Sequence, residues 1–137
     1  MNRHDAKTAK EPDSELDGWA HKVIGAALEV HRTLGPGFLE SIYGQALCVE
    51  LMDRGVPFRR QVPISVRYKA QIVGHGQMDL LVADRLVVEL KAVEALAQIH
   101  AVQVRSYLKA TGLNLGLLIN FNVPLLQQGI RRIIFHP

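Results

Sequence analysis

The sequence lacks several features that would assign it to a specialised class of protein. It has one cysteine, Cys48, so an internal disulfide framework is excluded and a reducing compartment is indicated. Cys48 lies in a helical pattern, where we expect a small buried hydrophobe rather than a nucleophile. No apolar run approaches the roughly 18 residues of a membrane span, and the first residues lack the apolar stretch of a secretory signal. We therefore expect a cytoplasmic protein with no membrane partner.

Paired Cys and His motifs are also missing, because Cys48 stands alone and the six histidines form no paired spacing. A zinc site is therefore not expected. The charge balance is mildly basic, with 16 Lys and Arg against 13 Asp and Glu, a net charge of +3 and a pI near 9.2. Basic residues gather at 58–69 and 130–137, where they form either a surface for a polyanion or ordinary solvated faces.

The length of 137 residues suits one domain with a real core. We predict a mobile tail over residues 1–13 and a single domain over residues 14–137. Apolar spacing predicts a first helix over 14–34, where Ser14 and Asp17 resemble a capping box. A second helix is expected to follow, with Pro36 in its first turn and its end at Arg54.

Alternating residues then predict three strands, at 58–68, 71–83 and 85–93, and Pro63 indicates an edge strand or a bulge. A helix over 95–111, a buried strand over 115–121 and a short helical or turn segment over 123–129 follow. Residues 130–135 form a last strand or helix. The order α-α-β-β-β-α-β plus a C-terminal element places the fold in the mixed α/β class.

The segment 78–91 is an apolar hairpin that carries three charged residues. If its turn is centred on Asp84, antiparallel pairing places Asp79 opposite Glu89, with Cβ atoms about 4.5 to 5.5 Å apart. Two carboxylates at that spacing need a cation, and strand alternation puts Lys91 on their face. The apolar neighbours point the other way, toward a helix layer: Leu80, Val82, Val88 and Leu90.

An oxygen-rich pair of this kind suits Mg²⁺ or Mn²⁺, which bind through one or two carboxylates and take further ligands from water and phosphate. A divalent ion beside a lysine is an arrangement for phosphodiester cleavage. The alternative is a surface salt bridge of Glu89 with Lys91 or a neighbour. The spacing alone does not choose between them.

The sequence Asp79-x9-Glu89-Leu90-Lys91 resembles the D…(D/E)xK signature of the PD-(D/E)XK nuclease superfamily. In addition, "GFLESIY" is Gly37-x-x-Glu40-x-x-Tyr43, the motif that names the GxxExxY protein family, and the similarity runs from about residue 16 to residue 134. This resemblance implies a restriction-endonuclease-like fold, in which helices flank a mixed sheet. It also implies a metal-dependent nuclease activity.

The resemblance also implies residue roles. Glu40, Asp79 and Glu89 match metal ligands that bind Mg²⁺ or Mn²⁺, and Lys91 matches the catalytic lysine. Gln103 and Tyr107 resemble the QxxxY motif, which positions substrate or the lysine, and as i,i+4 neighbours they can meet one cleft.

Tyr43 is an i,i+3 neighbour of Glu40 and is either a further substrate-positioning residue or a core aromatic. His31 and His100 are expected to be structural. One departure from the family is that "GHGQMD" replaces a YRAD-like stretch, so Gln77 stands where a basic residue is often found.

The leading hypothesis is therefore a Mg²⁺-dependent nuclease-like domain with a nucleic-acid partner. A non-catalytic module that binds nucleic acid or protein is the second hypothesis, and it would depend on Arg59, Arg60 and Arg67. A structural oligomer is a third. The sequence does not choose DNA over RNA, and a homodimer that spans a duplex is one option.

Overall fold

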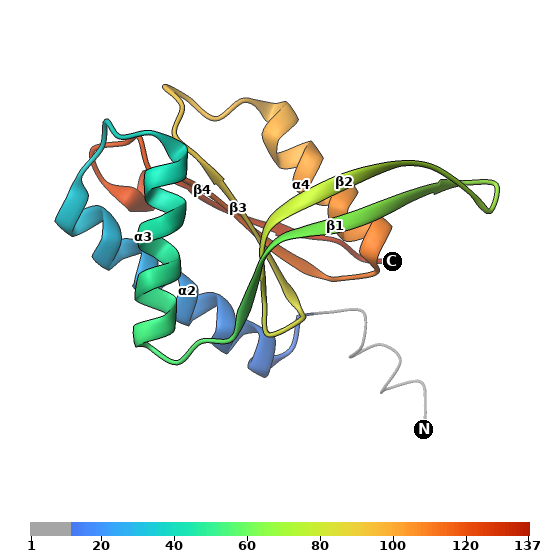
Figure 1. Cartoon of the computed structure of the whole chain (residues 1–137), viewed down its shortest axis with the longest axis horizontal. Coiled ribbons are helices and arrows are strands. Elements are labelled where there is room, and N and C mark those ends of the chain that lie inside the picture. The colour runs from blue at the N-terminus through green and yellow to red at the C-terminus, as the bar shows by residue number, and fades with distance from the viewer. Residues whose placement is uncertain (1–11) are drawn as a thin grey trace.

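The computed structural model describes residues 12–137 and has three helices and a five-stranded sheet in that part of the chain (Figure 1). The predicted tail at 1–13 lies mostly outside the described residues. In chain order the elements are α2 (Ser14–Leu34), α3 (Glu40–Asp53), β1 (Phe58–Tyr68), β2 (Gln71–Val82), β3 (Leu86–Lys91), α4 (Gln98–Thr111), β4 (Leu115–Asn120), the 3-10 turn η1 (Leu126–Gly129) and β5 (Ile130–Ile134).

The strands lie in the sheet in the order β1-β2-β3-β4-β5. The β3 and β4 pair is parallel and the other three pairs are antiparallel, so α4 is the crossover that joins two parallel neighbours. This mixed sheet with flanking helices is consistent with the predicted restriction-endonuclease-like fold. The prediction of an edge strand at Pro63 is also correct, because β1 is the outermost strand.

Helices cover both faces of the sheet. Residues of α2 and α3 pack with Leu80, Val88 and Leu117 in the larger core cluster. On the other face, Leu108 of α4 packs with Val87 and a second, smaller cluster. The central strands are thus buried on both sides, which explains their continuous apolar sequence. In Figure 1 the β1–β2 hairpin extends well beyond this layered body.

Most predicted elements are present, but three of their starts differ. The N-cap of α2 is Asp13, whose carboxylate accepts a hydrogen bond from the Leu16 amide, so the expected Ser14 capping box is wrong. Helix α3 begins at Glu40, not at Pro36, because Gly35 and Gly37 adopt left-handed backbone with φ of 69° and 109°. Helix α4 begins at residue 98, three residues later than expected.

Close packing fixes α4 on the sheet. A Cβ atom at Gly116 of β4 would lie 2.6 Å from a methyl group of Val104 on α4, which leaves no room for a side chain there. Helix α4 ends at Gly112 in the left-handed conformation (φ 76°), whose amide donates to the Leu108 carbonyl. The orientation of α4 is relevant to function because this helix carries two of the predicted site residues.

Candidate active site

The predicted register of the β2–β3 hairpin is confirmed. Leu80 pairs with Val88 and Val82 with Leu86, so the turn is centred on residue 84. Beyond the last paired residues the two strands exchange side-chain contacts instead of a regular ladder. The Asp79 amide donates to the Glu89 carboxylate at 2.7 Å, and the Leu90 amide donates to the Asp79 carboxylate at 2.8 Å. Each carboxylate therefore binds the backbone of the opposite strand.

This arrangement raises the pKa of both carboxyl groups. Glu89 is 4% exposed, and burial, followed by the charge of Asp79, raises its pKa to about 8. Burial also raises the pKa of Asp79, although the Leu90 amide, Lys91 and Arg60 oppose the shift. A buried pair of acids with raised pKa values is a common property of functional sites.

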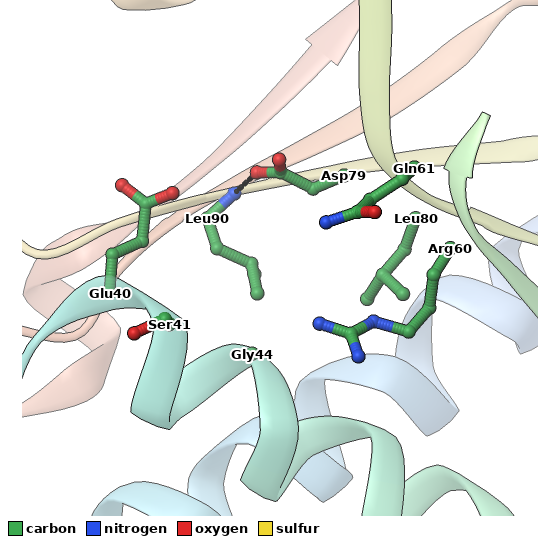
Figure 2. A pocket seen from close by; sticks show the side chains of 8 residues that line it. All are labelled: Glu40, Ser41, Gly44, Arg60, Gln61, Asp79, Leu80 and Leu90. Carbon is green, nitrogen blue, oxygen red and sulfur yellow. Dashed lines mark hydrogen bonds between the residues drawn. The ribbon is translucent and has the colours of Figure 1, made fainter. Parts of the chain in front are cut away.

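A cavity of about 160 Å³ opens beside this pair, between α3 and the base of the β1–β2 hairpin. Figure 2 shows Glu40 at one end, Asp79 on the opposite wall and the Arg60 guanidinium directed into the space between α3 and β1. Burial and the charge of Asp79 raise the pKa of Glu40, while Lys91 lowers it. Glu40 and Asp79 thus face one cavity, as the resemblance implied. Its lining residues are Glu40, Ser41, Gly44, Arg60, Gln61, Asp79, Leu80 and Leu90.

Lys91 ends β3 next to these carboxylates, and its charge lowers the pKa of Glu40, Asp79 and Glu89. None of the ion pairs within residues 12–137 includes Lys91 or Glu89, so the alternative of a simple Glu89–Lys91 salt bridge is not supported.

The chain beyond Lys91 is held by Asn120, which is 1% exposed and pairs with Lys91 in the sheet. Its side chain accepts from the Val93 amide at 3.0 Å and donates to the Val93 carbonyl at 2.9 Å. These bonds fix the exit of the strand that carries two predicted site residues.

Tyr107 of α4 forms another wall near the carboxylates. Burial and then the charge of Glu89 raise its pKa, and a backbone contact with Gln77 opposes the shift. A Cβ atom at Gly76 would lie 3.1 Å from its ring, so β2 and α4 approach closely here. Gln103, one turn earlier on α4, is exposed.

Tyr43 lies in the core and does not line the cavity. It is fully buried, stacked on Phe121 with ring centroids 4.6 Å apart. Its hydroxyl donates to the Gly35 carbonyl at 2.5 Å and accepts from the Phe38 amide at 3.1 Å. It therefore fixes the loop that leads into Glu40.

Both of the histidines expected to be structural make structural contacts. His31 is 8% exposed, and its Nε2 atom lies 2.8 Å from the Val123 carbonyl oxygen. His100 stabilises the start of α4 because its Nδ1 atom accepts from the Ala97 amide at 3.0 Å. Cys48 is buried, which raises the pKa of its thiol, as expected for a packing residue.

The donor set at this site fits a hard divalent cation, because it offers carboxylate oxygens that are partly desolvated and lack a paired cation. Asp79 and Glu89 would hold such an ion. In the described part of the chain, however, no three His, Cys, Asp or Glu side chains lie close enough together to form a ready metal site. Glu40 faces the pair across the cavity rather than joining it in one cluster.

The chain belongs to the PD-(D/E)XK nuclease superfamily, whose family model matches residues 17–133. Members generally use divalent metals and act on nucleic acids, so the match indicates a nuclease-like function and a nucleic-acid substrate. A comparison with curated proteins found no match. Between residues 12 and 137, no helix has the length and apolar character needed to cross a membrane.

Two residues of the site escaped the sequence reasoning. Arg60 appeared only as part of a basic strand, yet it shares the cavity with Asp79 and supplies positive charge although Gln77 does not. Gln77 instead donates to the Gln61 carbonyl at 3.2 Å. Asn120 gave no signal in the sequence beyond a polar residue at the end of an apolar strand.

Proposed function

We propose that this chain is a Mg²⁺-dependent nuclease that hydrolyses phosphodiester bonds at the cavity between α3, β1 and β2. The observation that supports this function best is the cross-bonded pair Asp79 and Glu89 beside Lys91. Two buried acids with raised pKa values are unfavourable in a purely structural role, and a divalent cation would relieve them.

In this proposal Asp79 and Glu89 hold Mg²⁺ or Mn²⁺, and Glu40 completes the acidic set from the facing helix. The ion, when bound, lowers the pKa of a water molecule and polarises the phosphoryl oxygen. The water oxygen then bonds to phosphorus, the bond from phosphorus to the leaving sugar oxygen breaks, and a proton passes from the water to that oxygen's side of the reaction.

The residues of the chain assist at defined positions. The Lys91 ammonium offsets the negative charge that develops on the phosphoryl group. Arg60 binds a phosphate oxygen in the cavity, for which a planar guanidinium is well suited. Gln103 and Tyr107 position the substrate from α4. Tyr43 acts indirectly, because it fixes the loop before Glu40.

Finer assignments belong to the same proposal. Gly37, Glu40 and Tyr43 support membership of the GxxExxY family, and a cytoplasmic location agrees with the lack of a secretory signal in the sequence. A homodimer would let two such small domains span a duplex.

The second candidate is a binding module of the same fold without catalysis. It is favoured by Arg60 and Arg67, which are exposed and take part in none of the ion pairs of residues 12–137. Such a module would bind nucleic acid through these cations and would not need Asp79 or Lys91.

One experiment separates the two candidates. Purified protein is incubated with single- and double-stranded DNA and RNA in Mg²⁺, in Mn²⁺ and in EDTA, alongside Lys91→Ala and Asp79→Asn. Cleavage that requires metal and is lost in both variants supports the nuclease. Binding that survives in both variants, with no cleavage by the unmodified protein under any condition, would refute it and support the module.

A further inference from the structure

Negative charge is distributed unevenly along this chain. No Asp or Glu occurs in residues 54–78 or after Glu94, while both segments contain Arg and Lys. These segments form β1, most of β2, α4 and β5. The side of the molecule built around α4 and the β1–β2 hairpin therefore carries cations and almost no carboxylates, apart from those of the active site.

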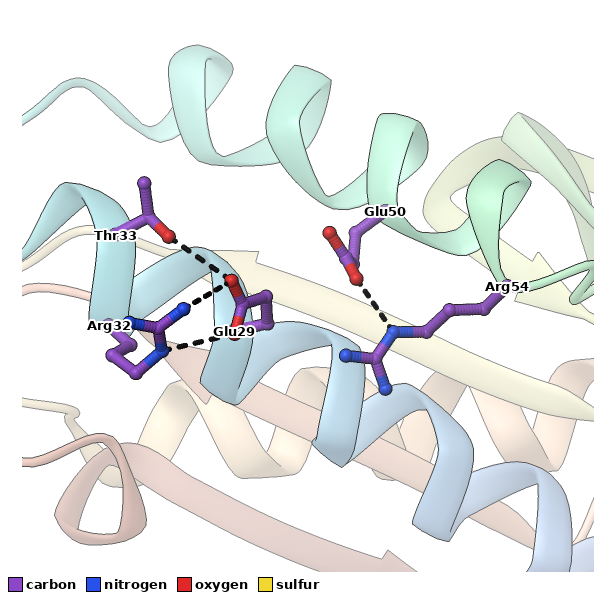
Figure 3. Close-up of polar contacts among 5 residues, drawn as sticks. All are labelled: Glu29, Arg32, Thr33, Glu50 and Arg54. Carbon is purple, nitrogen blue, oxygen red and sulfur yellow. Dashed lines mark hydrogen bonds and ion pairs between the residues drawn. The ribbon is translucent and has the colours of Figure 1, made fainter.

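The opposite side has its cations neutralised. Figure 3 shows Arg32 bound to Glu29 on α2 and Arg54 bound to Glu50 on α3, each at 2.7 Å. By contrast, none of the ion pairs within residues 12–137 involves the basic residues that surround α4: Arg67, Arg105 and Lys109.

Two of these cations share a cavity of about 480 Å³ between β1 and α4. Arg67 contributes from the hairpin and Lys109 from the helix, and the hydroxyl groups of Ser65 and Ser106 line the same space. Two cations and two hydroxyl donors around a space with no carboxylate are the groups that bind phosphate oxygens in nucleic-acid complexes.

A second cavity of about 260 Å³ continues along the outer side of α4 and shares Ser106 and Lys109 with the first. Arg105 lines it, with its guanidinium carbon 5.6 Å from the Phe135 ring centroid. This cation–π contact restrains the guanidinium while leaving its charge unpaired. We call the two cavities together the α4 groove, defined by Arg67, Arg105, Ser106 and Lys109.

We propose that the α4 groove binds the phosphodiester backbone of the nucleic acid next to the bond that is cleaved. The groove adjoins the active site, since Ser106 directly precedes Tyr107, whose pKa is influenced by Glu89. This inference rests on the proposed nuclease function, because it gives the substrate of that same site a second point of attachment.

The groove also explains how so small a domain holds a long substrate. The cavity beside Asp79 has a volume of about 160 Å³, enough for only a small part of a nucleic-acid chain. Contacts to phosphates outside the cavity fix the register of the strand without reading its sequence. This fits a chain in which we found no added DNA-recognition motif.

The test uses the full chain and two double variants that remove the same charge. Arg67→Gln with Lys109→Gln changes the α4 groove, while Lys22→Gln with Arg32→Gln changes the exposed side of α2. Fluorescence anisotropy measures binding of a labelled DNA oligonucleotide, single-stranded and as a duplex, in EDTA over a series of salt concentrations. We expect the groove variant to lose about 0.7 to 0.9 of the salt slope per phosphate contact, and the α2 variant to keep its slope.

The charge-retaining variant Arg67→Lys with Lys109→Arg should restore the slope, and circular dichroism melts check that every variant folds. Equal slopes for the groove and α2 variants, or no measurable binding by the unmodified protein, would overturn the inference. Its failure is distinguishable from that of the proposed function. Binding that depends on the groove without any metal-dependent cleavage refutes the nuclease but not the groove, and cleavage with unaltered slopes does the reverse.

Discussion

The amide of Asp79 donates to the carboxylate of Glu89, while the carboxylate of Asp79 accepts from the residue that follows Glu89. The two acids therefore satisfy backbone groups at the point where β2 and β3 stop pairing regularly. This contact holds both carboxylates in place, but it also keeps them close together and away from water. The pH dependence of stability should report that conflict.

We predict that Glu89→Gln increases stability at alkaline pH. The pKa of Glu89 is about 8 in the folded protein against an ordinary value of 4.5, so the folded state binds more protons than the unfolded state between these values. The favourable contribution of this group is complete below pH 4.5 and is lost as pH rises through 8. The difference in melting temperature between Glu89→Gln and the unmodified protein, measured in EDTA, should grow from pH 5 to pH 8. A difference that does not change with pH would contradict the raised pKa.

Mg²⁺ should stabilise the folded protein most at the alkaline end of this range. Protons compete with the ion for Asp79 and Glu89, whose pKa values are both raised, so binding weakens as pH falls. At an ion concentration about 100 times the dissociation constant, the gain is about 2.7 kcal/mol. Thermal melts with and without Mg²⁺ measure it, with Asp79→Asn as the variant that should show little gain. An equal gain in Asp79→Asn would place the ion elsewhere.

Gly44 allows a test of the cavity that changes no charge. A Cβ atom there would lie 3.7 Å from an Arg60 nitrogen and 3.8 Å from Leu90, which are ordinary contacts, so Gly44→Ala should fold normally. The longer side chain of Gly44→Leu would enter the cavity and displace Arg60. We expect cleavage to fall on the order of a hundredfold in Gly44→Leu and little in Gly44→Ala, as measured with a labelled oligonucleotide. Similar rates in the two variants would argue against this cavity as the reaction site.

Asn120→Ala should destabilise the fold and disturb the site together. The substitution leaves the Val93 amide and carbonyl without their side-chain partner, at a cost of about 1 to 3 kcal/mol. Because Asn120 also pairs with Lys91 in the sheet, cleavage should fall at temperatures where the variant is still folded. Asn120→Asp keeps the acceptor for Val93 and serves as the control. Denaturant unfolding and cleavage assays give the two results, and loss of neither would contradict the assigned role.

Tyr43→Phe should loosen the loop before α3 without disturbing the core. The ring stack on Phe121 remains, but the bonds to Gly35 and Phe38 are lost, which should destabilise the protein by about 1 to 2 kcal/mol. If Tyr43 only positions Glu40, cleavage should fall with little change in oligonucleotide affinity. A large loss of affinity would instead indicate direct contact with the substrate.

The sequence predicted the parts of the site that depend on local spacing. Hairpin symmetry about residue 84 placed Asp79 beside Glu89, and the structure has that register. Helical spacing could not foresee that Tyr43 turns into the core, because its side chain is fixed by Phe121, which is distant in the sequence. The positions of Arg60 and Asn120 depend likewise on strand pairings between distant segments, which no local pattern encodes.

Both outer strands of the sheet resist the addition of another strand. β1 carries Pro63, which has no amide hydrogen to offer a neighbour, and β5 carries Arg131 and Arg132, whose charges oppose stacking of like copies. Fibre-like association through the sheet is therefore disfavoured. Any symmetric pairing of two copies has to use side chains of the helices or loops, and such a pairing can form without covering the carboxylates.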